Sequence, residues 1–211
     1  MLKKLFFFKH LITSATNLSY VQRLKMSNLV SKNNIVWVDL EMTGLNIDKD
    51  TIIEMACIVT DDKLNIIAEN EDIVIHHSDE ALKQMSEWCV NQFQISGLTE
   101  QARNSKITLE EAENNMLEFI KKYTPSGSCP LAGNSIHMDK IFLNKYMKKF
   151  MNHLHYRIID VSSIKELSFR WNPDILNGAP KKKASHRALD DIKESIQELK
   201  YYQEHFFKTK I

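Results

Sequence analysis

The sequence predicts a single α/β domain in which a mixed sheet of five strands is flanked by helices. Three apolar segments rich in β-branched residues come first, and helical segments then alternate with two further strand-like segments. This order is typical of a mixed sheet with helices packed on it. At 211 residues the chain can bury one substantial core, and its five glycines and four prolines form no low-complexity stretch.

Each element is expected where the period of the hydrophobic pattern changes. The segment Ile35–Met42 has the β-branched and aromatic content of a buried strand, whereas the last helix carries apolar residues three and four apart, from Leu189 to Leu199. Segment 171–185 contains two prolines and a glycine and is expected to be a loop. The expected strands are 34–42, 51–60, 64–75, 129–133 and 156–160. The expected helices are 79–91, 108–123, 137–151, 161–170 and 187–206.

Residues 1–32 are interpreted as a basic N-terminal targeting segment, and residues 33–211 as the domain itself. Residues 1–38 carry six of the 28 basic residues and none of the 27 acidic ones, so the remainder has a formal net charge of −5. A basic, hydroxylated, acid-free leader is typical of mitochondrial import. Its apolar run Leu5–Phe8 is too short for a secretory signal or a membrane span, which need about 7–15 and about 20 residues. Met26 is an alternative start that would give a cytosolic form.

Two acids lie at the end of the first expected strand. Asp39 and Glu41 are two residues apart, so they share one face of the strand and can contact the same ion. Thr43-Gly44 ends the strand directly afterwards, which places both acids at its C-terminal end, where sites in α/β sheets form. An exposed edge strand with ordinary surface acids is the alternative, and the apolar residues before Asp39 disfavour it.

Two later segments add a histidine and further acids. Asp139 follows a turn of small residues and is expected in the first turn of a helix, where it also complements the helix dipole. His186 is placed just before the last helix and Asp191 in its opening turns, and spacing alone does not distinguish Asp191 from its neighbour Asp190. Carboxylates gathered from distant segments repel one another unless cations lie between them, usually Mg²⁺ or Mn²⁺. The pattern therefore points to metal-dependent phosphoryl chemistry.

Seven motifs between residues 33 and 204 carry a family resemblance: WVDLEMTGL, IIEMA, MSEWC, SGLT, AGNSIHMD, LHYRIIDVSSIKEL and SHRALDDIKESI. Together they resemble the oligoribonuclease family, within the DEDDh 3′→5′ exonucleases of the ribonuclease H-like fold. The resemblance implies that fold and a pair of divalent cations, Mg²⁺ or Mn²⁺. It also implies a histidine general base at His186 and catalytic, metal-binding acids at Asp39, Glu41, Asp139 and Asp191. It thereby selects Asp191 over Asp190.

The same resemblance implies a substrate and a partner. It predicts that the enzyme hydrolyses very short single-stranded RNA, dinucleotides above all, to 5′-mononucleotides, and that it is a homodimer. The implied substrate contacts are Leu45 as a wedge between two bases, Trp88 as a stacking platform, Ser135, Arg157 and Ser162 as a cap on the 5′ phosphate, and Tyr156 of the partner subunit. The chain departs from the family pattern at Phe93, where a histidine is usual, and this puts one ligand contact in doubt.

Other interpretations of these residues stay open. A DEDDh exonuclease that trims longer RNA or DNA ends is the main functional alternative. A catalytically silent nucleotide-binding protein is disfavoured, because it would be expected to have lost one of the acids or the histidine, and all are present. Trp88, taken alone, is more typical of a core aromatic residue, and Glu54 of a structural acid than of a further metal ligand. The histidine pairs and the three scattered cysteines lack the spacing of a zinc site.

Overall fold

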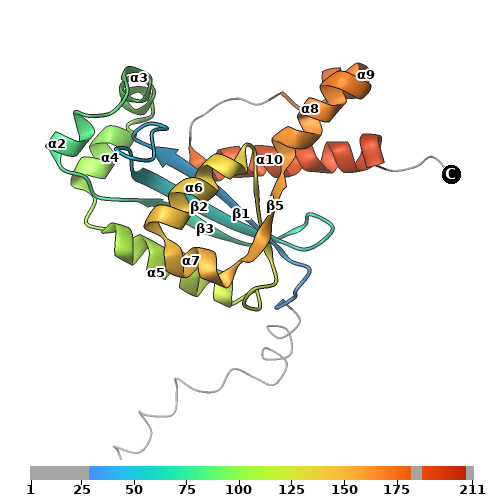
Figure 1. The fold of residues 1–211 in the computed structure, drawn as a ribbon, viewed down its shortest axis with the longest axis horizontal. Coiled ribbons are helices and arrows are strands. Elements are labelled where there is room, and N and C mark those ends of the chain that lie inside the picture. The colour runs from blue at the N-terminus through green and yellow to red at the C-terminus, as the bar shows by residue number, and fades with distance from the viewer. Residues whose placement is uncertain (1–28, 182–186, 208–211) are drawn as a thin grey trace, which may run out of the picture.

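A computed structural model describes residues 29–181 and 187–207 of the chain. Five strands form one sheet in the order β3-β2-β1-β4-β5 (Figure 1). Neighbours among β1, β2 and β3 run antiparallel, whereas β4 and β5 run parallel to β1. The strands are β1 (Ile35–Met42), β2 (Ile52–Thr60), β3 (Ile66–Val74), β4 (Pro130–Gly133) and β5 (His155–Asp160). The predicted mixed five-stranded sheet is therefore confirmed, with β1 at its centre.

Helices lie on both faces of this sheet (Figure 1). Three helices share a core with one face, and the long C-terminal helix packs on the other. The first of the three begins at a capping box, in which the side chains of Thr108 and Glu111 each accept from the other's backbone N–H. The helices are α5 (Leu109–Lys121), α6 (Ile136–Tyr146), α7 (Lys148–His153) and α10 (Ala188–Tyr202), and α10 continues into the π-helix η1 (Gln203–Phe207).

The alternation of side chains along β1 decides which face the first two acids occupy. Val38 packs in the core under α5, α6 and α7. Trp37 faces the other way, packs against α10 and donates from Nε1 to Thr60 Oγ1 at 3.0 Å. Because residues two apart share a face of a strand, Asp39 and Glu41 lie on the α10 side together with Trp37.

A small group of helices stands at the end of the sheet where β1 finishes and β2 begins. It packs around Ile53 and the fully buried Phe93. Its members are α2 (Asp79–Leu82), α3 (Glu87–Ser96) and α4 (Leu98–Asn104). The prediction of one helix over 79–91 is wrong, because Ser86 starts a new helix by accepting at Oγ from the backbone N–H of Cys89 at 3.2 Å.

Two further elements differ from the prediction. The helix predicted over 137–151 is divided at Met147, whose backbone leaves the helical region at φ −132° and separates α6 from α7. Part of the segment predicted as a loop, 171–185, is helical: α8 (Val161–Trp171) includes its first residue, and α9 (Pro173–Asn177) follows. Pro173 begins α9, where its fixed φ is already helical and its missing N–H would have no intrahelical partner.

Some predictions concern residues outside the described ranges. His186 belongs to residues 182–186, and the predicted targeting segment falls almost wholly within residues 1–28. β1 begins at Ile35, three residues after the predicted end of that segment. Among residues 29–181 and 187–207, none of the helices is long and apolar enough to cross a membrane.

Candidate functional site

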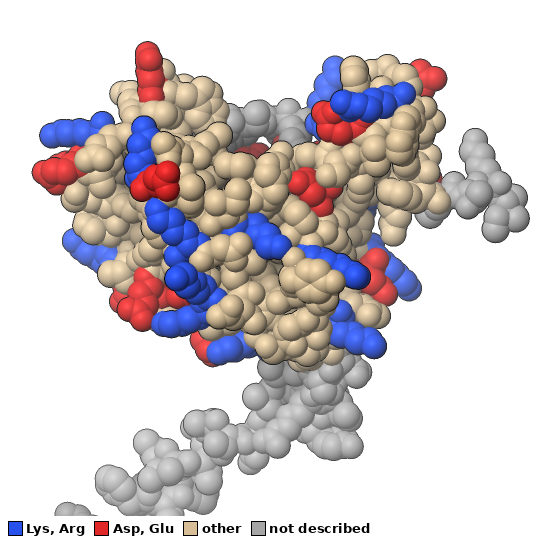
Figure 2. All heavy atoms as spheres, in the orientation of Figure 1, with Lys and Arg blue, Asp and Glu red and all other residues tan. Residues whose placement is uncertain are grey.

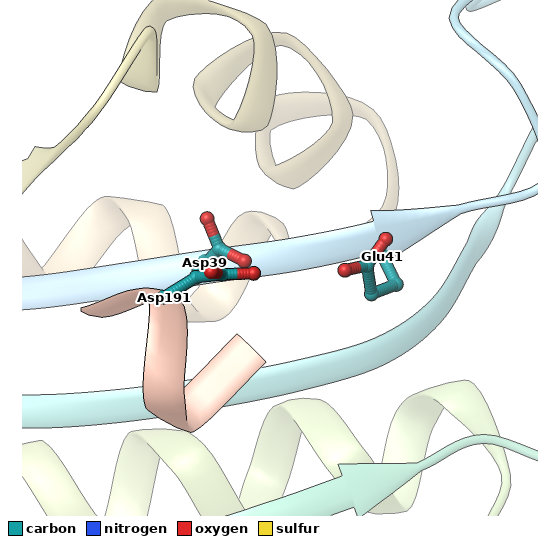
Figure 3. A group of neighbouring side chains, drawn as sticks. All are labelled: Asp39, Glu41 and Asp191. Carbon is teal, nitrogen blue, oxygen red and sulfur yellow. The ribbon is translucent and has the colours of Figure 1, made fainter. Parts of the chain in front are cut away.

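Three acidic side chains converge between β1 and the start of α10 (Figure 3). One carboxylate oxygen from each of Asp39, Glu41 and Asp191 lies within 4.8 Å of the other two. The first two side chains come from the α10 face of β1, and Asp191 comes from the first turn of α10. Asp190 is exposed and does not belong to this group. The geometry thus favours Asp191 as the functional acid of its pair.

The fourth predicted acid, Asp139, lies against the same strand from the first turn of α6. Its side chain is 6% exposed, and Oδ1 accepts from the backbone N–H of Leu40 at 3.0 Å. The short strand β4 pairs with β1 only at Val36 and Trp37. At Leu40, beyond this pairing, the carboxylate of Asp139 takes the place of a strand partner. Asp139 is not part of the three-carboxylate group, and its role as a metal ligand stays a prediction.

Burial and mutual repulsion make this a site for a cation. Glu41 is only 8% exposed, and its pKa rises to about 8, first because burial removes water and then because Glu54, Asp191 and Asp139 lie nearby. Burial also raises the pKa of Asp139 to about 7, against the lowering effect of backbone hydrogen bonds. The ligand atoms are all carboxylate oxygens, which suit hard divalent cations. The residues present therefore fit such a cation.

Glu54 stands beside the acids, but other groups occupy its carboxylate. It lies directly opposite Glu41 in the β1–β2 ladder and is fully buried. Its Oε1 accepts from Arg187 Nη2 at 2.9 Å, and its Oε2 accepts from the backbone N–H of Ala188 at 3.2 Å. These contacts agree with the structural interpretation of Glu54. Arg187 and its second partner Asp72 were not foreseen, although an arginine directly after His186 was a visible signal.

A pocket of about 540 Å³ opens next to the acids. Glu41 forms part of its wall, and Leu45 and Trp88 stand at its rim with 67% and 56% of their surface exposed. The loop that carries Leu45 is held by the buried Asp50, which accepts from the backbone N–H of Asn46 at 2.8 Å. The pocket is lined by Leu40, Glu41, Met42, Gly44, Leu45, Ser86, Trp88 and Cys89.

The two aromatic residues of α3 have opposite environments. Trp88 is more than half exposed at the pocket, so its interpretation as a core residue is wrong. Phe93 is fully buried among the residues around Ile53. The departure from the family pattern at Phe93 therefore places an aromatic ring in the core.

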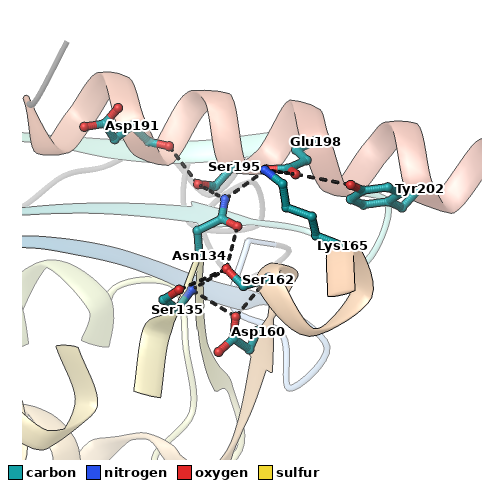
Figure 4. A network of polar contacts seen from close by, with 9 residues as sticks. All are labelled: Asn134, Ser135, Asp160, Ser162, Lys165, Asp191, Ser195, Glu198 and Tyr202. Atoms are coloured by element: carbon teal, nitrogen blue, oxygen red, sulfur yellow. Dashed lines mark hydrogen bonds and ion pairs between the residues drawn. The ribbon is translucent and has the colours of Figure 1, made fainter. Parts of the chain in front are cut away.

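Ser135 and Ser162, two residues of the predicted phosphate cap, are in contact (Figure 4). Their hydroxyl oxygens lie 3.1 Å apart, and the backbone N–H of Ser135 donates to Ser162 Oγ at 2.9 Å. The same N–H donates to Asp160 Oδ1 at 3.0 Å. Ser135 adopts the left-handed conformation, with φ 51°, at the start of α6. The turn thus brings two hydroxyl groups and a backbone amide together.

Asn134 joins this pair of serines to the helix that carries Asp191 (Figure 4). Its Oδ1 accepts from Ser162 Oγ at 3.0 Å, and its Nδ2 donates to Ser195 Oγ at 2.8 Å. Ser195 Oγ in turn donates to the backbone carbonyl of Asp191 at 2.8 Å. The sequence predicted only a small-residue turn at this position. The polar side chain between Gly133 and Ser135 was the signal that could have identified the contact.

The third predicted cap residue, Arg157, and the residue predicted to act from the partner subunit, Tyr156, lie near the start of the edge strand β5. Tyr156 is 71% exposed and Arg157 is exposed as well. The guanidinium carbon of Arg157 lies 5.5 Å from the centre of the Tyr156 ring. Within one chain, these two residues and the serine pair occupy opposite ends of β5.

Alternative metal sites find no support in the part of the chain that the structure describes. There, the group around Asp39 is the one cluster of His, Cys, Asp and Glu with metal-binding geometry. His77 Nε2 lies 2.8 Å from the carbonyl oxygen of Ile52, and His153 Nε2 lies 3.0 Å from Thr124 Oγ1. The three cysteines are buried free thiols.

Known proteins with sequences similar to this chain are exonucleases. A family model described as Exonuclease matches residues 36–199. The chain is 59% identical over 177 residues to "Oligoribonuclease, mitochondrial" of Homo sapiens, covering 84% of this chain and 75% of the relative. It is 50% identical over 181 residues to "Oligoribonuclease" of Pasteurella multocida, covering 86% of this chain and 98% of the relative.

Solved structures of exonuclease I share the fold. A zinc-bound complex of the Escherichia coli enzyme with single-stranded DNA superposes with a TM-score of 0.67 at 14% identity, covering 84% of this chain and 42% of that one. The enzyme of Methylocaldum szegediense gives a TM-score of 0.59 at 17% identity, over 83% of this chain and 41% of that one. The chain thus spans about two fifths of the length of these structures. Because the sequence identities are only 14% and 17%, the similarity shows the fold alone.

Proposed function

The chain belongs to the oligoribonuclease family of 3′→5′ exonucleases, and we propose that it degrades very short single-stranded RNA, dinucleotides above all, to 5′-mononucleotides. The observation that carries the proposal is the convergence of Asp39, Glu41 and Asp191 within 4.8 Å beside a pocket of about 540 Å³. Such carboxylates bind the cations used in phosphodiester hydrolysis, and the pocket offers room for nucleobases.

The acids Asp39, Glu41, Asp139 and Asp191 would hold a pair of divalent cations, Mg²⁺ or Mn²⁺. When bound, these cations lower the pKa of an attacking water and stabilise the leaving 3′ oxygen. His186 would accept the proton of that water, since an ordinary histidine pKa of about 6.5 suits proton transfer near neutral pH. The hydrogen bond that Asp139 accepts from the Leu40 amide supports the metal-binding role of Asp139, because it fixes the carboxylate beside β1.

Leu45 and Trp88 would hold the two bases of the substrate. Both are large apolar side chains with most of their surface exposed at one pocket, and exposed apolar side chains gathered at a pocket are typical of a ligand-binding surface. An exposed tryptophan face can stack a base at a gain of about 1–3 kcal/mol. The leucine would separate that base from its neighbour.

The 5′ phosphate would be received by Ser135 and Ser162 together with Arg157. The 3.1 Å contact between the two hydroxyls supports this role, and the arginine fork can bond a phosphate in two places. A further substrate contact would come from Tyr156 of the partner subunit, as the family resemblance implies, so that the active form is a homodimer. Its exposure on the edge strand suits contact with a second copy.

The charge distribution supports a short substrate. Proteins that track long nucleic acids need many Lys and Arg contacts to phosphates. Residues 39–211 have a formal net charge of −5, and basic and acidic side chains are interspersed on the face shown in Figure 2. A site closed by a phosphate cap at one end and by the acids at the other has room for two nucleotides.

Incubation of the protein with a 5′-labelled diribonucleotide tests the activity. We expect 5′-mononucleotides in the presence of Mn²⁺, no turnover in EDTA, and recovery when Mn²⁺ is restored. Asp39→Asn should fold normally and stay inactive, and His186→Ala should slow turnover while dinucleotide affinity is kept. Hydrolysis that continues in EDTA, or products that carry a 3′ phosphate, would overturn the proposal.

We further propose that residues 1–32 direct the protein to mitochondria and that translation from Met26 yields a cytosolic form. The leader's composition supports this, as does the mitochondrial name of the human relative. A fluorescent protein fused behind residues 1–32 should enter mitochondria. The same fusion with Met1 replaced, so that translation starts at Met26, should stay in the cytosol, and uniform cytosolic fluorescence of both fusions would refute the assignment.

A further inference from the structure

We propose that Glu54, Asp72 and Arg187 form a clamp that sets the position of Asp191, and that this clamp thereby tunes the affinity of the site for its divalent cation. The three residues come from β2, β3 and the residue that precedes α10. The inference rests on the proposed function, because it assumes that Asp191 is a metal ligand. It concerns positioning residues, since the clamp itself does not contact the cation.

The start of α10 is capped by side chains of the sheet. The first N–H groups of a helix have no intrahelical partner and usually bond to the side chain of the preceding residue. Arg187 precedes α10 and supplies no such cap. Instead, the Ala188 amide donates to Glu54 Oε2 at 3.2 Å and the Leu189 amide donates to Asp72 Oδ1 at 3.0 Å. The sheet therefore determines where the helix begins.

Arg187 connects the two capping acids. Its Nη2 lies 2.9 Å from Glu54 Oε1 and 3.4 Å from Asp72 Oδ2. Glu54 is fully buried, and a buried carboxylate is tolerated only with a cation and hydrogen bonds at hand. Each carboxylate thus uses one oxygen for the arginine and the other for a backbone amide. Because both oxygens of each carboxylate are bonded, the start of α10 has few alternative positions relative to β2 and β3.

The clamp lies one helical turn from Asp191. The first intrahelical bond of this turn runs from the Asp191 amide to the Arg187 carbonyl at 3.1 Å. A helix advances about 1.5 Å and turns about 100° per residue, so a slip of one residue at its start would turn Asp191 away from β1. The other two acids are fixed by β1, and Glu41 stands directly opposite Glu54. The clamp therefore ties the part of the metal site that belongs to α10 to the strand pair that includes β1.

Mn²⁺ binding to the full-length protein, measured by titration calorimetry, tests the clamp without reference to activity. Asp72→Ala removes the acceptor of the Leu189 amide, and Asp72→Asn keeps an acceptor at that position. Partners that orient metal ligands typically contribute about 10–100-fold to metal affinity. We expect Asp72→Ala to weaken Mn²⁺ binding within that range and Asp72→Asn to lose much less. In turnover assays, excess Mn²⁺ should restore most of the rate of Asp72→Ala.

Glu69→Ala is the matched control. Glu69 also lies on β3 and forms an ion pair with α10, at 2.9 Å from Lys193 Nζ, but away from the start of the helix. It should leave Mn²⁺ affinity unchanged. The double variant Glu54→Gln/Arg187→Gln removes the buried ion pair while it preserves side-chain volume, and it should weaken Mn²⁺ binding as Asp72→Ala does.

The outcomes separate the clamp from the function on which it rests. Unchanged Mn²⁺ affinity in Asp72→Ala, with only a lower melting temperature, would overturn the clamp and leave the metal site standing. If the double variant does not fold, the Mn²⁺ affinities of Asp72→Ala, Asp72→Asn and Glu69→Ala are sufficient to test the clamp. The proposed metal site and the clamp would both be overturned if the wild-type protein bound no Mn²⁺, or if Asp191→Asn bound Mn²⁺ with the same affinity as the wild type.

Discussion

The acids of the site should make the metal-free protein lose stability as the pH rises. Glu41 is nearly buried and has its pKa raised from 4.5 to about 8, first by burial and then by Glu54, Asp191 and Asp139. A group whose pKa is higher in the folded state holds its proton there more tightly than in the unfolded chain. Its stabilising effect is therefore complete below pH 4.5 and is lost as the pH rises through 8. The buried Asp139, with its pKa raised to about 7, acts in the same direction.

The size of the effect follows from the shift. One pKa unit corresponds to about 1.4 kcal/mol, so the rise of Glu41 from 4.5 to about 8 amounts to at most about 5 kcal/mol of unfolding free energy. Glu41→Gln has nearly the same shape and cannot ionise. In EDTA, the variant and the wild type should have similar stability near pH 5, and the variant should become the more stable of the two by several kcal/mol near pH 8, within the limit of about 5.

Urea unfolding followed by tryptophan fluorescence measures this difference at each pH. Saturating Mn²⁺ should remove most of the wild-type loss near pH 8, because a cation that binds only the folded state stabilises it, and it binds the deprotonated acids. The same addition should help Glu41→Gln much less. Parallel pH profiles for wild type and variant in EDTA would contradict this prediction, since they would mean that Glu41 ionises as readily in the folded protein as in the unfolded chain.

Three further predictions concern the register, the bases and the partner. Asp191→Asn should lower turnover at least about 100-fold, which is the usual effect of losing a group that stabilises charge in the transition state. Asp190→Asn changes an exposed residue and should lower turnover only slightly. The reverse order would show that Asp190, and not Asp191, is the functional acid. Trp88→Ala should raise the KM for a dinucleotide about 5–150-fold, as expected from the loss of one stacked base, while Ile95→Ala on the same helix should leave the KM unchanged; an unchanged KM in Trp88→Ala would remove Trp88 from the substrate site. Mixing Tyr156→Ala subunits with Asp191→Asn subunits should restore activity by forming sites from the two intact halves, and no recovery after demonstrated subunit exchange would contradict a shared site.

Much of the site could be predicted because it depends on local periodicity. Alternation along β1 placed Asp39 and Glu41 on one face, and that face is the one that α10 covers. The choice of Asp191 over Asp190 came from the family resemblance, because a spacing along one segment does not reveal which side of a helix faces a distant strand. The exposure of Trp88 likewise depends on how α3 packs, and its local sequence favoured the core.

What escaped prediction depends on contacts between distant segments or on competing local signals. The bond between Arg187 and Glu54 joins residues 133 positions apart, so neither sequence neighbourhood announces it. Pro173 marks the start of α9, yet the same residue type is also the usual sign of a loop. Ser86 is a residue type that often caps helices, but the apolar pattern on either side of it favoured one continuous helix.

The ratio of turnover rates for a diribonucleotide and for an RNA of about 20 nucleotides, measured with the same protein at saturating Mn²⁺, shows whether the enzyme is specific for dinucleotides. A site capped at the 5′ phosphate by Ser135, Ser162 and Arg157 should cleave the diribonucleotide fastest, with rates that fall as the chain lengthens and respond only weakly to salt. Arg157→Ala should reduce this preference, because only the shortest substrate presents its 5′ phosphate to the cap. Equal rates for both lengths, with steep salt dependence, would contradict the account and identify a nuclease that trims longer ends.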